Sequence, residues 1–165
     1  MSRPRRILVA GIGNIFLGDD GFGSEVARQL IGEGLPPEVD VADFGIRSYD
    51  LAYAMMDGYD VTILVDATAH GQTPGTVSLI EPDLNEFDQL DASTTDAHAM
   101  GPTAAFRILN AIGGSGGKFY LVGCEPAILE AEDGRIGLSE QVATAVPRAI
   151  ALLKSLLADL LEISK

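Results

Sequence analysis

The fold is decided by residues 7–23, which read ILVAGIGNIFLGDDGFG. A short run of Ile, Leu and Val bounded by glycines is typical of a strand that is covered on both faces. The next segment, Ser24 to Ile31, predicts a helix, so the turn between strand and helix ends on Asp19 and Asp20. Ligands of open α/β sheets bind at the edge where such turns lie. We therefore expect a functional site at this turn.

A dinucleotide-binding motif is one interpretation of the turn, because Gly11 and Gly13 begin a G-x-G-x-x-G pattern and Asp43 follows a second apolar run. The third glycine of that pattern is replaced by Phe16, whose ring should obstruct close packing of helix against strand. A helix N-terminus attracts anions, yet here two acids precede it. A nucleotide-binding α/β module stays an alternative, but the carboxylates favour a cation, a polarised water or a basic peptide.

The composition predicts one domain spanning residues 1–165, since 47% of the chain is hydrophobic and no linker or repeat interrupts it. The net charge of −13 argues against a nucleic-acid partner, which would need lysine and arginine to neutralise phosphates. The apolar runs are too short for a membrane span or a signal peptide, and the single cysteine, Cys124, fits a reducing compartment. We expect a cytoplasmic protein without a membrane partner.

Strand and helix patterns alternate along the chain, which predicts an α/β fold with parallel strands and right-handed crossovers. Only nine residues, 67–75, precede the fourth strand, and they show no helical pattern, so we expect that strand to be antiparallel. Pro147 predicts a kink or a break in the last helix. The expected later strands are Val39–Phe44, Val61–Val65, Thr76–Ile80 and Phe119–Gly123, and the expected later helices are Leu51–Met56, Thr103–Ile112 and Ser139–Glu162.

Two carboxylates should meet at one crevice, because Asp20 follows the first strand, Asp66 follows the third, and these strands are neighbours in the order 2-1-3. A long polar loop, Glu81 to Ala97, ends just before His98 and is long enough to reach the same edge. Two carboxylates and an imidazole make a plausible divalent-metal site. His70 is a rival ligand in a turn-rich loop beyond Asp66.

Cys124 follows the fifth strand, where together with His98 and an aspartate it suggests a thiol hydrolase. The alternative is a buried cysteine that packs as a small hydrophobic residue, which is the commoner role of a free cysteine. Nothing in the sequence indicates an activated thiolate.

Four segments, in this order, resemble the hydrogenase maturation proteases, the endopeptidases that trim the C-terminus of the nickel–iron hydrogenase large subunit. The resemblance covers nearly the whole chain. Its segments are Gly11–Asn14 with Gly18–Gly23, then Leu64–Ala67 with Pro74–Thr76, then His98 with Gly101, and finally Leu121–Gly123 with Glu125–Pro126.

The resemblance implies a three-layer α/β/α sandwich whose mixed five-stranded sheet has the order 2-1-3-5-4, with strand 4 antiparallel. It further implies that Asp20, Asp66 and His98 bind metal and act in catalysis. The metal would be the nickel already inserted in the large-subunit precursor, so nickel would belong to the substrate rather than to the enzyme. One cleavage would then release the precursor's C-terminal extension.

One position departs from the family pattern, because many members carry two glycines after the second strand and this chain has Ser48 where the second is expected. The metal would either polarise the scissile carbonyl or activate a water, and the sequence does not choose between these roles. A non-catalytic chaperone that recognises the same precursor is a further alternative to the protease.

Overall fold

The structure is a computed structural model that describes residues 4–81, 117–127 and 137–163. Its centre is a five-stranded sheet with the order β2-β1-β3-β5-β4, in which every neighbouring pair is parallel except β4 and β5. The predicted order and the antiparallel fourth strand are both confirmed. The strands are β1 (Ile7–Ile12), β2 (Val39–Gly45), β3 (Val61–Ala67), β4 (Val77–Ile80) and β5 (Lys118–Cys124).

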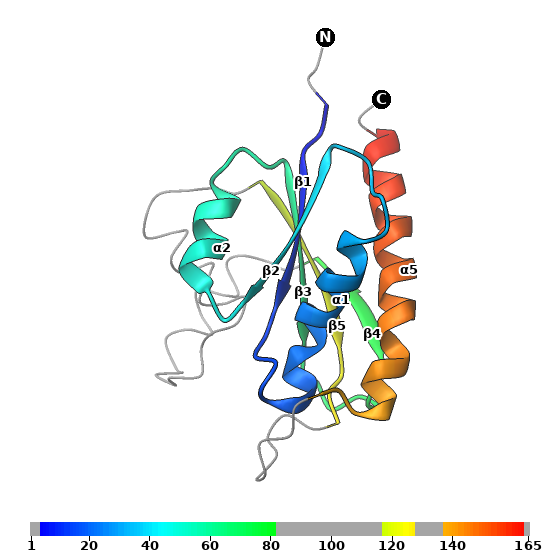
Figure 1. Ribbon diagram of the computed structural model, residues 1–165. Helices are drawn as coiled ribbons and strands as arrows, with labels where there is room; N and C mark the ends of the chain where they lie inside the picture. The colour runs from blue at the N-terminus through cyan, green and yellow to red at the C-terminus, as the bar shows by residue number, and fades with distance from the viewer. Residues whose placement is uncertain (1–3, 82–116, 128–136, 164–165) are drawn as a thin grey trace.

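Helices cover both faces of the sheet, as Figure 1 shows. The helices α1 (Phe22–Ile31) and α5 (Glu140–Ile163) pack on one face, and α2 (Ser48–Met55) packs on the other. A short 3-10 helix, η1 (Gly18–Gly21), leads into α1. The result is the expected three-layer α/β/α sandwich.

The two faces of β1 explain its unbroken apolar sequence. Ile7 and Val9 contact the layer of α1 and α5, whereas Leu8 and Ala10 contact the layer of α2. Side chains alternate between the faces of a strand, so a strand with helices on both sides needs apolar residues at every position. The whole of β1 is buried.

Of the two outcomes predicted at Pro147, a kink or a break, the break does not occur, because α5 continues through Pro147 as one helix. Pro147 lies on the exposed face, while Val146 and Ala149 are buried beside it. Packing of this apolar stripe against the sheet keeps the chain helical on both sides of Pro147, although proline removes one backbone hydrogen bond. The expected helix Thr103–Ile112 and, apart from Glu81 itself, the expected loop Glu81–Ala97 lie outside the described residues. Among the helices that the structure describes, none has the length and apolar character needed to cross a membrane.

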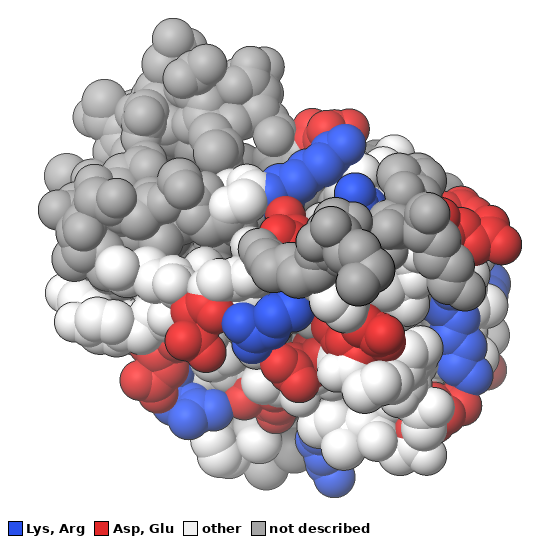
Figure 2. All heavy atoms as spheres, turned by 90° about the horizontal axis from the view of Figure 1, so that it is seen from above, with Lys and Arg blue, Asp and Glu red and all other residues white. Residues whose placement is uncertain are grey.

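Charged side chains of both signs share the edge where the parallel strands begin, which Figure 2 shows from above. Arg6 lies 3.9 Å from Asp40, and its guanidinium lies 4.6 Å from the centre of the Tyr59 ring. The Arg6 backbone N–H donates to the Asp60 carboxylate at 2.8 Å. These contacts join the starts of β1, β2 and β3 at the edge opposite to the candidate site.

Candidate functional site

The site residues lie at the carboxyl edge of the sheet, where the chain leaves β1 toward β2 on one side and leaves β3 toward β4 and β5 on the other. This reversal of strand order is a switch point of the kind at which α/β proteins bind ligands. Asp20 stands on η1, directly after the turn that follows β1, and Asp66 is the sixth residue of β3. Gly13 separates them, because a Cβ built on Gly13 would lie 3.7 Å from the Asp66 carboxylate and would collide with the Asp20 backbone carbonyl.

The Asp20 carboxylate is held by the turn between β1 and η1. The Asn14 backbone N–H donates to Oδ2 of Asp20 at 2.7 Å. The Asn14 side-chain oxygen accepts the Phe16 N–H at 2.9 Å, and the Asn14 backbone carbonyl accepts the Leu17 N–H at 3.1 Å. These inward polar contacts leave the apolar side chains of the turn outside, and Phe16 is 61% exposed. The turn therefore fixes Asp20 and keeps the Phe16 ring away from the sheet.

Asp66 is buried, since it is only 7% exposed, and the Asp20 carboxylate lies close enough to act on it electrostatically. Burial raises the pKa of Asp66 well above its ordinary value, and the neighbouring Asp20 charge raises it further. A hydrogen bond from the Ala67 N–H to Oδ1, at 2.9 Å, acts in the opposite direction on the pKa. Two like charges of which one is poorly solvated repel each other, so a divalent cation between them would be stabilising.

The third predicted ligand, His98, lies outside the described residues, so its meeting with Asp20 and Asp66 stays a prediction. The rival His70 lies in the described loop after β3 and is exposed, with its backbone N–H donating to Glu125 at 2.8 Å. Across residues 4–81, 117–127 and 137–163, no three His, Cys, Asp or Glu side chains are grouped closely enough to hold a metal ion. The described part of the site is thus a pair of carboxylates.

A glycine that the dinucleotide interpretation overlooked brings α1 close to the sheet. A Cβ on Gly23 would lie 2.8 Å from the Ile12 nitrogen and closer still to the carbonyl oxygens of Ile12 and Val65. The expected obstruction of helix–strand packing by the Phe16 ring does not occur, because Gly23 makes the close approach and the Phe16 side chain is exposed. The motif DDGFG contains the signal, since its second glycine is the second residue of the helix.

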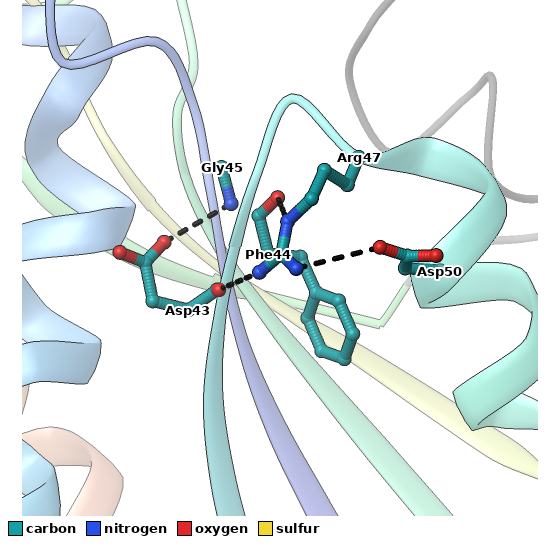
Figure 3. Close-up of polar contacts among 5 residues, drawn as sticks. All are labelled: Asp43, Phe44, Gly45, Arg47 and Asp50. Carbon is teal, nitrogen blue, oxygen red and sulfur yellow. Dashed lines mark hydrogen bonds and ion pairs between the residues drawn. The ribbon is translucent and has the colours of Figure 1, made fainter.

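Asp43, the acid of the dinucleotide interpretation, already has partners within the protein. Its Oδ1 accepts the Ser24 hydroxyl at 2.7 Å and the Gly45 N–H at 3.0 Å. Figure 3 shows the adjacent Arg47 side chain, whose guanidinium donates to the Asp43 carbonyl at 2.7 Å and lies 3.4 Å from Asp50. These contacts fix the short connection between β2 and α2. Together with the acids on η1, they weaken the case for a dinucleotide.

Ser48, the departure from the family pattern, is the first residue of α2. The connection after Gly45 is therefore only Ile46 and Arg47, and the Gly45 carbonyl accepts the Gly13 N–H at 2.9 Å. The loops after β1 and β2 consequently form one continuous rim beside the carboxylate pair.

Cys124 is buried at the end of β5, and burial raises the pKa of its thiol to about 11. The nearby Asp19 charge raises the pKa further, while Arg148 lowers it. A catalytic cysteine needs a thiolate near neutral pH and access to substrate. Cys124 has neither property and packs in the core with Val122.

The fold and the paired carboxylates define an α/β protein with an acidic ligand site at the switch point of its sheet. The chain matches the family model described as hydrogenase maturation protease over residues 24–155. It is 35% identical over 152 residues to a putative hydrogenase maturation protease of Methanocaldococcus jannaschii, covering 92% of this chain and 96% of that protein.

Two solved structures show the same likeness. The hydrogenase maturating endopeptidase HybD from Escherichia coli is 29% identical, with a TM-score of 0.76 and 93% of each chain covered. The hydrogenase 2 maturation peptidase from a Thaumarchaeota archaeon is 32% identical, with a TM-score of 0.67, 93% of this chain and 98% of that chain covered. The chain belongs to the hydrogenase maturation protease family and is an endopeptidase. The match to the family model includes Asp66 and His98 but begins after Asp20.

Proposed function

We propose that this chain is a nickel-dependent endopeptidase that removes the C-terminal extension of a nickel–iron hydrogenase large-subunit precursor after nickel insertion. The observation that carries the proposal is the meeting of Asp20 and the buried Asp66 at the switch point. A carboxylate pair without a cation is electrostatically unfavourable there, and the precursor's metal would relieve the repulsion. Recognition of nickel thus becomes a physical condition for docking.

In this proposal the metal arrives as part of the substrate. Asp20, Asp66 and His98 would each offer one ligand to the nickel of the precursor, and oxygen and imidazole ligands without thiolate suit a labile divalent site. Docking would bring the scissile peptide to the carboxyl edge of the sheet. Fixing reacting groups in this way lowers the barrier through proximity and orientation. We place the reaction in the cytoplasm.

The test compares nickel-loaded and nickel-free precursor, each incubated with the purified chain, and reads the precursor mass by mass spectrometry. We expect loss of the C-terminal extension with the nickel-loaded precursor only. Cleavage of both forms would refute nickel dependence. An unchanged mass with folded protein would refute the protease and favour the chaperone alternative.

The residue assignment is tested by replacing Asp20, Asp66 and His98 singly with alanine. We expect each variant to fold and to lose processing, because one ligand to the metal is missing. Asp60→Ala is the matched control, since this carboxylate also accepts a backbone N–H but lies at the opposite edge of the sheet. Full activity in all three site variants would overturn the assignment.

A further inference from the structure

Asp19, the neighbour of Asp20, is completely buried and holds two distant parts of the chain. Its Oδ2 accepts the Ala127 N–H at 2.8 Å and the Ser139 hydroxyl at 2.8 Å. Its Oδ1 accepts the Ser139 N–H at 2.6 Å. Residues more than 100 positions apart in sequence are thereby fixed to η1. The sequence around Asp19 gave no sign of these partners.

Glu125, two residues before Ala127, holds the loop that follows β3. Its side chain is 6% exposed, and its two carboxylate oxygens accept the N–H groups of His70 at 2.8 Å and Gly71 at 3.0 Å. Its backbone carbonyl accepts the Gly75 N–H at 2.8 Å, and its own N–H donates to the Thr76 carbonyl at 2.9 Å. One residue thus secures the beginning and the end of this loop.

The two sets of contacts meet in the segment 125–127 directly after β5. On one side the segment is bonded to η1, which carries Asp20, and on the other to the loop that continues from Asp66. The 3-10 helix adds a constraint on direction, because consecutive side chains in it point about 120° apart. An Asp19 side chain fixed toward the interior therefore leaves Asp20 to face the edge of the sheet.

We propose that Asp19 and Glu125 are positioning residues that hold the Asp20 and Asp66 carboxylates in their mutual geometry by bracing both to segment 125–127. The inference rests on the proposed function only for its consequence in catalysis. The hydrogen bonds that form the brace are present in the protein without metal or substrate. Neither residue contacts the reacting atoms in this scheme.

Two backbone amides report the brace directly, because the Asn14 N–H donates to Asp20 and the Ala67 N–H donates to Asp66. Hydrogen exchange of both amides is measured by NMR in the metal-free protein, relative to amides in the core of β1. We expect Asp19→Ala to speed exchange at Asn14 by about fivefold, the ratio that corresponds to one net hydrogen bond of about 1 kcal/mol. Glu125→Ala should speed exchange at Ala67 by a similar ratio.

Processing of nickel-loaded precursor supplies the second readout, with kcat and KM determined well below the melting temperature of each variant. We expect kcat to fall on the order of 10- to 100-fold in Asp19→Ala and Glu125→Ala, because small displacements of a catalytic group cost that much. Asp60→Ala is the control, and it should lower stability without changing kcat or exchange at Asn14 and Ala67.

Conservative variants keep the test decisive if the alanine variants do not fold. Asp19→Asn and Glu125→Gln each retain one acceptor oxygen, so the same effects should appear at reduced size. Exchange rates at Asn14 and Ala67 within twofold of the original protein would overturn the brace. If the original protein fails to cleave nickel-loaded precursor, the proposed function is lost, and amide exchange alone then decides the brace.

Discussion

Replacement of Gly23 by alanine tests how closely α1 must approach the sheet. The new Cβ would lie within 3.0 Å of three backbone atoms, which belong to Ile12 and Val65 and have no flexible side chain to rotate away. Helix α1 would have to move outward from the carboxyl ends of β1 and β3. Because Asp20 lies two residues before the start of α1, the same movement would separate it from Asp66.

The expected loss of stability follows from two opposing effects. Overpacking in a closely packed core costs typically ~1–3 kcal/mol, and rigid backbone neighbours place Gly23 at the upper end of that range. Alanine recovers some free energy through its better helix propensity and a more restricted unfolded chain, on the order of 0.5 kcal/mol. A net loss of about 2.5 kcal/mol lowers the melting temperature by ~5–10 °C in a domain of this size.

Gly32→Ala is the matched control, since Gly32 caps the other end of α1. Its φ of −81° suits alanine, and the nearest atom to a new Cβ is the Gln29 carbonyl at 3.7 Å. Alanine restricts the unfolded chain to a similar extent in both variants, so the difference between their melting temperatures isolates the effect of the collision at the new Cβ of residue 23. Thermal unfolding followed by circular dichroism measures it. A melting temperature for Gly23→Ala equal to or above that of Gly32→Ala would refute the close approach.

Three further predictions concern ionisable groups. Asp66→Asn should stabilise the metal-free protein at pH 7 by about 1 kcal/mol or more, because it removes the cost of burying a carboxyl group whose ionised form is disfavoured by burial and by Asp20. It should also abolish processing, because one proposed metal ligand is lost. The folded state binds the Asp66 proton more tightly than the unfolded chain, so urea titrations should show the original protein losing stability as pH rises through the raised pKa, a trend absent in the variant. An asparagine variant of lower stability at pH 7 would contradict this. Burial raises the pKa of the Cys124 thiol to about 11, so at pH 8 it should react with iodoacetamide more than about 100-fold slower in the folded than in the unfolded protein. The Cys124→Ser variant should retain processing, and loss of processing in this variant would support the thiol mechanism instead. Burial and the hydrogen bond to Asp40 raise the pKa of Tyr59 to about 12, so their stabilisation should be complete below pH 10 and lost between pH 10 and 12. Ultraviolet titration should show one tyrosine that ionises at higher pH than the others, and this signal should be absent in Tyr59→Phe. A pKa of Tyr59 near 10 would refute the prediction.

The fold was largely predictable because its signals are local. The apolar run of β1 with its glycine turn, and the nine-residue connection that excludes a helical crossover, lie within short segments. Tertiary packing decided the behaviour of α5, where the buried stripe outweighs the break expected at Pro147. It also decided which residue of helix α1 approaches the sheet, because the dinucleotide pattern would place its third glycine at position 16 and the actual contact is at Gly23.

The sequence by itself determined the α/β class, the order of elements and the two acids near the carboxyl ends of neighbouring strands, since strand periodicity and turn residues act over a few positions. Only the tertiary structure decided how those acids interact. Burial and the proximity of Asp20 raise the pKa of Asp66, and Asp19 and Glu125 find partners across the chain, Asp19 at a separation of more than 100 residues. Desolvation and long-range hydrogen bonds depend on which segments pack together, and no local pattern of residues encodes that neighbourhood.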